Sequence, residues 1–325
     1  MNGTTTIYVD TPLDARLVEE LCEGVAPHRI LRPAVERESV LAAPAADVAF
    51  GEAEVAFGQP AVEDVLRSER LRWLHVSTAG FTRYDTPDFR EIARARGLVV
   101  TNSSSVYASA CAEHAVAFLL GAARRLPDAL ASRAANGSMD WKRLRAESRT
   151  MAGQKVVLLG YGGIARELVK RLAGFDMEMV AIRRRPTGDE AVRTVPPDRL
   201  AAELADADHV MNLLPDNAES RGSVDIEMFS AMKPGVVFHN IGRGTTVDQG
   251  ALLDALRSGH VAEAWLDVTD PEPLPDDHPL RAEPRCFITP HIAGGHGDES
   301  RALLRHFLSN FRRFMSGAPL VDRVM

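Results

Sequence analysis

The chain has 325 residues, a length that suggests about two domains. Its three cysteines, Cys22, Cys111 and Cys286, show neither metal-ligand nor redox spacing, so no metal site is predicted. Its formal net charge of -7 argues against nucleic acid as a partner, because a phosphate backbone selects a basic face. We find no signal-peptide pattern and no run near the ~18 consecutive apolar residues of a membrane span, and therefore expect a cytoplasmic protein without a membrane partner.

In the first third of the chain, short apolar runs alternate with helical patterns, which is typical of βαβ units and parallel sheets. The predicted strands are TIYV (6–9), VAFG at Val48, EVAF around Val55, WLHV (73–76) and LVVT (98–101). The predicted helices are residues 13–25, 60–68 and 86–96. Gly97 stands where a glycine commonly ends a helix.

An apolar helix is predicted next, from about Tyr107 to Arg125, with Pro127 as its end and a polar stretch after it. A second alternation of strands and helices begins at Lys155. Its predicted strands are VVLLG (156–160), MVAI (179–182), HVMNLL (209–214), VVFHN (236–240), AEAWLDV (262–268) and CFIT (286–289). The last predicted helix runs from about Asp298 to Met315.

These patterns predict an α/β protein of two Rossmann-like, doubly wound parallel-sheet domains separated by a cleft. We assign residues 106–293 to a dinucleotide-binding domain. Residues 1–105 and 294–325 are assigned to a smaller, flavodoxin-like substrate domain. The last helix is placed there because the strands of the larger domain have ended by Thr289.

A glycine-rich turn joins the strand VVLLG to the helix ARELVKRL. It fits the pattern G-x-G-x-x-[GA], in which Gly160 makes the tight turn, Gly162 admits the pyrophosphate and Ala165 lets the helix pack on the strand. The helix N-terminus offers free N–H groups to the phosphates. We predict a nicotinamide dinucleotide site. The residues expected to form it are Gly160, Gly162, Gly163, Ile164, Arg183, Arg184, Leu214, Pro215, Ile241 and Gly242.

The end of the second strand of this domain indicates which nucleotide binds. The strand MVAI leads into Arg183-Arg184-Arg185, and no acidic residue occurs before Asp189. An acid would hold the ribose 2′-hydroxyl of NAD, whereas guanidinium groups bind a 2′-phosphate through charge-assisted contacts. We predict NADP(H) as the preferred cofactor and NAD(H) as the alternative. A solvated charged turn is the other interpretation of the arginines.

Three further strands of the domain end in residues that suit reduction of a keto acid. Arg243 follows VVFHN, Glu272 follows AEAWLDV, and His291 follows CFIT. Hydride attack builds negative charge on a carbonyl oxygen, and His291 is the natural acid to supply a proton there. Glu272 would favour the imidazolium, and Arg243 would grip a substrate carboxylate. From spacing alone this trio is only suggestive.

The segments GYGGIA, HNIGRGTTVDQGALLDAL, WLDVTDPEPLP, TPHIAG, STAGF (77–81) and TNSSSVYASACAEHAVAFLL resemble the D-isomer-specific 2-hydroxyacid dehydrogenase family. The resemblance runs from about Val48 to the last helix. It implies that Arg243, Glu272 and His291 are catalytic and that Asp267 binds the nicotinamide amide. It also implies a substrate site formed by Thr78, Ala79 and Gly80, with Tyr107 nearby. Two departures are Ser105, where glycine is common, and Trp265, where a small residue is common.

Arg183 in place of an acid resembles the glyoxylate/hydroxypyruvate reductase branch of that family. We therefore expect NADPH-dependent reduction of a short 2-keto acid to the D-2-hydroxy acid. One alternative is an NAD-linked D-2-hydroxyacid dehydrogenase with a bulkier substrate, and another is a non-catalytic, dinucleotide-sensing binding protein. A homodimer built on the cofactor domain is also expected, because the apolar helix and the loop at Trp141 suggest a buried partner surface.

Overall fold

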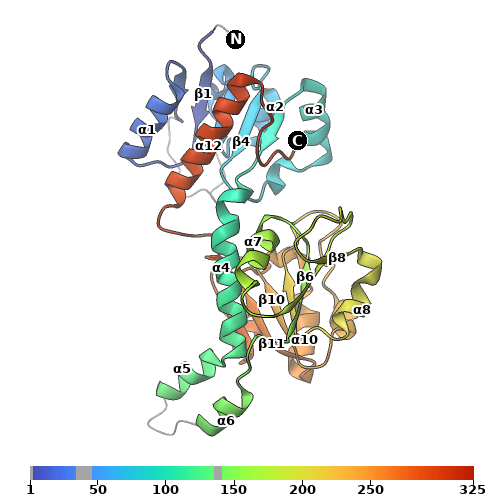
Figure 1. Cartoon of the computed structure of the whole chain (residues 1–325). Helices are drawn as coiled ribbons and strands as arrows, with labels where there is room; N and C mark the ends of the chain where they lie inside the picture. The colour runs from blue at the N-terminus through green and yellow to red at the C-terminus, as the bar shows by residue number, and fades with distance from the viewer. Residues whose placement is uncertain (1–2, 34–45, 135–140) are drawn as a thin grey trace. The chain divides into compact units, whose positions relative to one another are not determined.

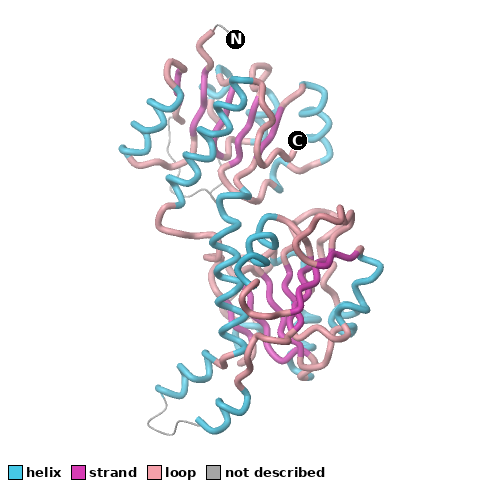
Figure 2. The backbone as a smooth tube through the Cα atoms, in the orientation of Figure 1, coloured by secondary structure: helices cyan, strands magenta, loops and turns pink. Residues whose placement is uncertain are grey.

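The computed structural model of the chain describes residues 3–33, 46–134 and 141–325, and part of the polar stretch before Trp141 lies outside these ranges. The chain divides into two compact units (Figure 1). The first comprises Met1–Tyr107 with His296–Met325, and the second comprises Ala108–Gly295. These boundaries fall two residues later than those expected from the sequence. Each unit contains one parallel sheet flanked by helices (Figure 2).

The first unit is built on a five-stranded parallel sheet with the order β2-β1-β3-β4-β5, the flavodoxin-like order. Its strands are β1 (Thr6–Val9), β2 (Arg29–Leu31), β3 (Val55–Gly58), β4 (Trp73–Val76) and β5 (Val99–Thr101). Its helices are α1 (Ala15–Val25), α2 (Val62–Arg67), α3 (Pro87–Arg96) and α12 (Glu299–Ser316), with short 3-10 turns at Val48–Glu52 and Thr82–Tyr84.

Alternating strand residues bury both faces of this sheet. In β1, Ile7 and Val9 pack with the helices α1 and α12, whereas Tyr8 packs on the opposite face with the residues of α2 and α3. Figure 1 shows α1 and α12 side by side. Phe307 of α12 stacks on Phe57, with ring centroids 4.4 Å apart, and also on Trp73. The last helix therefore completes the core of the first unit.

The strand predicted at Val48 is wrong, because VAFG forms a 3-10 turn there. The Asp47 side chain accepts a hydrogen bond from the Ala49 N–H at 2.9 Å and so caps the turn. Val48 is 99% exposed, and Phe50 is buried. The segment thus has no strand face to bury. Residues 29–31, for which no strand was predicted, form the edge strand β2.

The second unit is built on a seven-stranded parallel sheet with the order β12-β11-β10-β9-β6-β7-β8. Its strands are β6 (Lys155–Leu159), β7 (Glu178–Ile182), β8 (Arg193–Val195), β9 (His209–Asn212), β10 (Val236–Asn240), β11 (Val261–Leu266) and β12 (Cys286–Ile288). Its helices are α4 (Ser104–Ala123, which starts in the first unit), α5 (Leu126–Ala134), α6 (Trp141–Glu147), α7 (Gly163–Leu172), α8 (Leu200–Leu204), α9 (Ile226–Ala231), α10 (Gln249–Ser258) and α11 (Pro279–Ala282), with 3-10 turns at Pro197–Arg199 and Gly244–Thr246. The short edge strand β8 was not expected from the sequence.

Helix α4 ends earlier than predicted, and Pro127 lies in the first turn of a separate helix, α5, where proline is tolerated. Among the described helices, α4 is long and apolar enough to span a membrane, and half of it is buried. The core helix of a compact domain meets the same criterion. Trp265, which stands where a small residue is common in the family, packs against α4. A Cβ on Gly121 of that helix would lie 2.7 Å from the Trp265 ring.

The stacked position of Phe307 gives a test of the packing in the first unit. Phe307→Ala should lower the free energy of unfolding by about 3–5 kcal/mol, because it leaves a cavity between α12 and the sheet. Urea unfolding followed by tryptophan fluorescence measures the change, since Trp73 is stacked on this ring. Arg312→Ala, on the exposed face of the same helix, should change stability little. Equal stability of both variants would contradict the packing described.

Candidate active site

The glycine-rich turn lies between β6 and α7 at the carboxyl edge of the second sheet. Gly160 has φ +105°, a conformation that side-chain-bearing residues rarely adopt. Its N–H donates to the Ile182 carbonyl of β7 at 3.1 Å. Among the described residues, no atom would lie within 4 Å of a Cβ on Gly162, and no side chain caps the start of α7. The turn thus leaves open space and free N–H groups where a pyrophosphate would bind.

The loops after β9 and β10 pass close to this turn. A Cβ on Gly242 would lie 2.6 Å from the Leu214 carbonyl oxygen, so only glycine fits there. Leu214 also lies beside Gly160, since its Cδ2 would be 3.7 Å from a Cβ on that residue. Ile241 is buried, and Pro215 is exposed. Ile164, in the first turn of α7, is half-buried. These residues surround the glycine-rich turn and fit a dinucleotide.

A buried network of polar side chains holds these two loops, and sequence reasoning missed it. Asn212 Nδ2 donates to Asn240 Oδ1 at 3.0 Å and to Thr246 Oγ1 at 2.7 Å. Asn212 Oδ1 accepts from the Leu214 N–H, and Asn240 Oδ1 accepts from the Gly242 N–H. Each unmade bond of such a buried group would cost about 1–3 kcal/mol. The available signal was an asparagine at the end of each of two buried strands.

Two of the three arginines after β7 form ion pairs with glutamates. Arg183 Nη1 donates to Glu190 Oε1 at 2.6 Å, and Arg184 pairs with Glu219. Arg185 is exposed. The sequence interpretation gave no role to Glu190, because seven positions separate it from Arg183 along the chain. The loop after β7 brings the two side chains together.

Glu272 and His291 meet as the sequence predicts. Glu272 Oε1 lies 2.5 Å from His291 Nδ1, and both side chains are partly exposed. With the carboxylate as acceptor, Nδ1 carries a proton, and Nε2 is left to face a substrate. Arg243 belongs to the same edge, after β10, and its Nη1 donates to the Gly242 carbonyl at 2.6 Å. Within the described ranges, no hydrogen bond or ion pair joins Arg243 to the other two residues.

The loop that carries His291 is held by the buried carboxylate of Asp267. Asp267 Oδ2 accepts from the Ala293 N–H at 2.9 Å. Asp267 Oδ1 accepts from the Ile292 N–H at 2.9 Å and from the Thr289 hydroxyl at 2.6 Å. His291 itself has φ +53°, a sparsely populated conformation for a residue with a side chain. The carboxylate therefore stabilises a strained loop around the candidate acid.

His114 of α4 supports this loop from the other side. Its Nε2 lies 3.3 Å from the Thr289 hydroxyl and 3.8 Å from Asp267 Oδ1. Burial lowers the pKa of His114, which favours the neutral ring. Because the Thr289 hydroxyl donates to Asp267, we assign the His114 Nε2 proton as the donor to that hydroxyl. The sequence analysis did not predict this contact.

In the first unit, the turn after β4 holds the predicted carboxylate site. Thr78, Ala79 and Gly80 are half-buried, and within the described residues none of their N–H groups donates a hydrogen bond. Asn102 Nδ2 donates to the Ala79 carbonyl at 2.7 Å, and the Tyr107 hydroxyl lies 2.9 Å from the Ser77 carbonyl. The turn is thus fixed by its carbonyl groups. Its free N–H groups can bind an anion.

Tyr107 also contacts the start of α12, because its hydroxyl lies 3.2 Å from Glu299 Oε1. Ser105, which stands where glycine is common in the family, donates its N–H to Asp322 Oδ2 at 2.9 Å. Asp322 therefore satisfies one of the free N–H groups at the beginning of α4.

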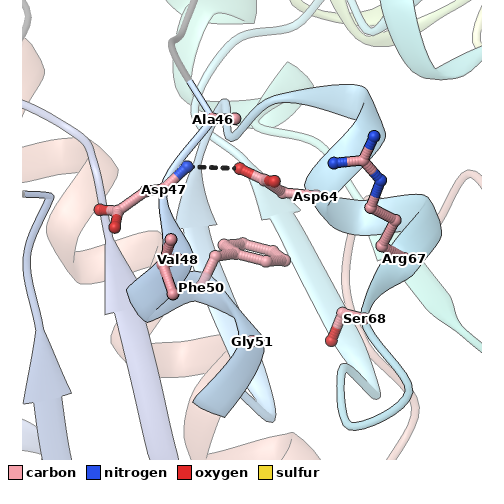
Figure 3. Close-up of a pocket in the computed structure, with 8 residues that line it drawn as sticks. All are labelled: Ala46, Asp47, Val48, Phe50, Gly51, Asp64, Arg67 and Ser68. Carbon is pink, nitrogen blue, oxygen red and sulfur yellow. Dashed lines mark hydrogen bonds between the residues drawn. The ribbon is translucent and has the colours of Figure 1, made fainter.

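The first unit contains a pocket of about 250 Å³. Figure 3 shows the residues that line it, such as Asp47, Phe50, Asp64 and Arg67. Its 3-10 turn precedes β3, and its Ser68 precedes β4. The pocket therefore lies at the amino end of the strands, the edge opposite the turn at Thr78. Among the described residues, no group of three or more His, Cys, Asp or Glu side chains is placed to hold a metal ion.

The second unit matches a known protein family. Residues 116–293, more than half of the chain, match the family described as "D-isomer specific 2-hydroxyacid dehydrogenase, NAD binding domain". D-3-phosphoglycerate dehydrogenase of Mycobacterium leprae is 33% identical over 241 residues, which are 72% of this chain and 44% of that protein. The glyoxylate reductase/hydroxypyruvate reductase of Mus musculus is 37% identical over 202 residues, 61% of each chain. The chain thus spans about half the length of the relatives that it matches.

Solved structures match over nearly the whole chain. The NADPH-dependent glyoxylate/hydroxypyruvate reductase of Sinorhizobium meliloti, in complex with NADP and malonate, is 25% identical, with a TM-score of 0.76 over 99% of this chain and 97% of that one. A D-isomer specific 2-hydroxyacid dehydrogenase of Xanthobacter autotrophicus, in complex with NADPH and MES, is 25% identical, with a TM-score of 0.79 over 99% and 98%. The chain also contains the glycine-rich turn, the Glu272–His291 pair and the Asp267 loop. Because the family model covers more than half of the chain, the chain belongs to the family of D-isomer-specific 2-hydroxyacid dehydrogenases.

Proposed function

We propose that this protein reduces a small 2-keto acid, similar to glyoxylate or hydroxypyruvate, to the D-2-hydroxy acid, with NADPH preferred over NADH. The observation that carries the proposal is the hydrogen-bonded Glu272–His291 pair, which lies at the same sheet edge as the open glycine-rich turn. The similarity to glyoxylate/hydroxypyruvate reductases, one of them described as NADPH-dependent, supports the substrate class and the nucleotide.

The residues suggest a division of labour during reduction. When bound, the nicotinamide cofactor supplies the hydride. Glu272 orients the His291 ring through Nδ1, so that Nε2–H can donate a proton to the carbonyl oxygen as negative charge develops there. Arg243 binds the substrate carboxylate and polarises the carbonyl. In the first unit, the free N–H groups of the turn at Ala79 can bind an anion, and Tyr107 fixes that turn.

Two alternatives remain, and one of them has specific support. The Arg183–Glu190 pair reduces the positive charge available to a 2′-phosphate, which favours an NAD-linked dehydrogenase for a bulkier substrate. A dinucleotide-sensing protein without activity would also keep the nucleotide site. The intact His291–Glu272 pair argues against that second alternative, because a sensor has no need of a proton donor.

The protein is further proposed to be a cytoplasmic homodimer. Leu130 of α5 and Trp141 of α6 are 71% and 55% exposed, so both helices after α4 present apolar surface. A second copy of the chain would cover them.

The proposed reaction is tested by following nicotinamide absorbance with NADPH or NADH against glyoxylate, hydroxypyruvate, pyruvate and phenylpyruvate. We expect turnover that is faster with NADPH and with the two shorter, more polar acids. Faster turnover with NADH and phenylpyruvate would support the NAD-linked alternative. Tight NADPH binding without turnover on any acid would support the sensor.

His291→Ala should reduce turnover roughly 10²–10⁴-fold, the usual contribution of a general acid. Affinity for NADPH, measured by cofactor fluorescence, should change little, because His291 acts on the substrate. His296→Ala is the matched control, since this histidine is five residues further on and exposed. Unchanged turnover of His291→Ala would remove the histidine from the mechanism.

Light scattering at micromolar concentration should give twice the mass of one chain. Trp141→Glu should shift the protein towards the monomer, because a charge in a buried apolar contact is costly. An unaltered protein that is monomeric under these conditions would rule out the proposed dimer.

A further inference from the structure

Glu190 is held by a tight turn after β7. Its Oε1 accepts from the Thr187 N–H at 2.7 Å, and its Oε2 accepts from the Gly188 N–H at 2.8 Å. The Thr187 hydroxyl, which also contacts Asp189, lies 2.9 Å from Oε1. Its side chain is only 3% exposed. The Thr187 amide, with the other donors, keeps the pKa of Glu190 well below its usual value. The carboxylate is therefore a fixed negative charge at neutral pH.

This fixed charge faces Arg183, the first arginine of the predicted nucleotide-selecting cluster. Arg183 Nη1 lies 2.6 Å from Glu190 Oε1 and 3.1 Å from the Thr187 hydroxyl. The Arg183 side chain is 32% exposed, ten times the exposed fraction of its partner. Glu190 thus neutralises much of the Arg183 charge, while the guanidinium keeps an accessible edge.

The turn also borders the glycine-rich turn. The Ala191 N–H, next to Glu190, donates to the Tyr161 hydroxyl at 3.1 Å, and Tyr161 lies between Gly160 and Gly162. Arg183 is further tied to β8 through its backbone N–H, which donates to the Val195 carbonyl at 2.9 Å. Arg183 and Glu190 are consequently placed at the edge of the nucleotide site rather than on a remote surface.

Glu190 is a poor substitute for the acid that binds the ribose of NAD. Its oxygens are already surrounded by two backbone N–H groups, the Arg183 guanidinium and the Thr187 hydroxyl, and the side chain is almost inaccessible. A ribose hydroxyl would have to displace one of these donors. The effect of Glu190 on the nucleotide is therefore electrostatic, exerted through Arg183.

We propose that Glu190 is a built-in counter-ion that weakens the selectivity of the site for NADP(H) over NAD(H). With Arg183 largely neutralised, the attraction for a 2′-phosphate depends more on Arg184 and Arg185, which are exposed and screened by solvent. The site therefore accepts both nucleotides, and Glu190 sets the ratio of their affinities. This inference rests on the proposed nicotinamide-dependent function.

The test is the affinity of the full-length chain for NADPH and NADH, measured by nucleotide fluorescence without substrate. Glu190→Gln keeps the shape of the side chain and removes its charge. We expect the Kd for NADPH to fall about five- to tenfold, the effect of one partly screened charge, with little change for NADH. Asp189→Asn is the matched control, because it removes the same charge from the neighbouring, exposed residue, whose carboxylate contacts the Thr187 hydroxyl instead of forming the direct pair with Arg183. It should shift the ratio of the two affinities much less.

Weaker or unchanged NADPH binding by Glu190→Gln, with or without a change for NADH, would overturn the inference. It would show that Glu190 holds Arg183 in its binding position or has no role. An equal effect of Asp189→Asn would also overturn it, because the direct pair would then be irrelevant. If the unaltered chain bound neither nucleotide, the proposed function itself would fail, which is a distinct outcome.

Discussion

The buried carboxylate of Asp267 is the interaction on which the candidate active site depends. It follows β11, the strand next to the edge strand β12, and binds the N–H groups of Ile292 and Ala293 on the loop after β12. Because these donors lie on both sides of the carboxylate, the loop is held with His291 in a left-handed conformation. Such a conformation costs of order 1–3 kcal/mol and persists only where the surroundings compensate it. The position of the candidate acid is therefore set by a residue that comes from another strand.

The same physical principle fixes the nucleotide side of the sheet edge. Asn212 and Asn240 are buried, and they satisfy each other as well as the loop amides. A buried amide that lost its hydrogen-bond partner would lower the free energy of unfolding by about 1–3 kcal/mol, which is a sizeable fraction of the total for a domain. The loops after β9 and β10 consequently have one arrangement, in which Gly242 contacts the Leu214 backbone. A preorganised loop pays no reorganisation cost when a ligand binds.

The residues that determine the charge of the nucleotide site are not the residues that determine its shape. The strand ends and glycines fit a dinucleotide in general, whereas we propose that the loop after β7 selects between the two nucleotides. There Arg183 carries a buried partner, Glu190, and Arg184 carries an exposed one, Glu219. Buried pairs are screened by salt much less than exposed pairs. The two arginines are thus not equivalent, although the sequence presents them side by side.

Local patterns were sufficient for much of the structure. Alternating apolar runs predicted most strands of both sheets, and the glycine pattern, the Glu272–His291 pair and the family resemblance came from contiguous motifs. The pattern failed at Val48, where a local cap formed a 3-10 turn, and at the short edge strands β2 and β8, which bury too little surface to leave a signal. Sequence by itself determined the fold class and the chemical types at the strand ends, because both follow from short-range periodicity and residue identity. Only the tertiary structure decided that Glu190 pairs with Arg183 and that Asp267 and His114 hold the His291 loop, because those contacts join segments that the sheet and its loops bring together.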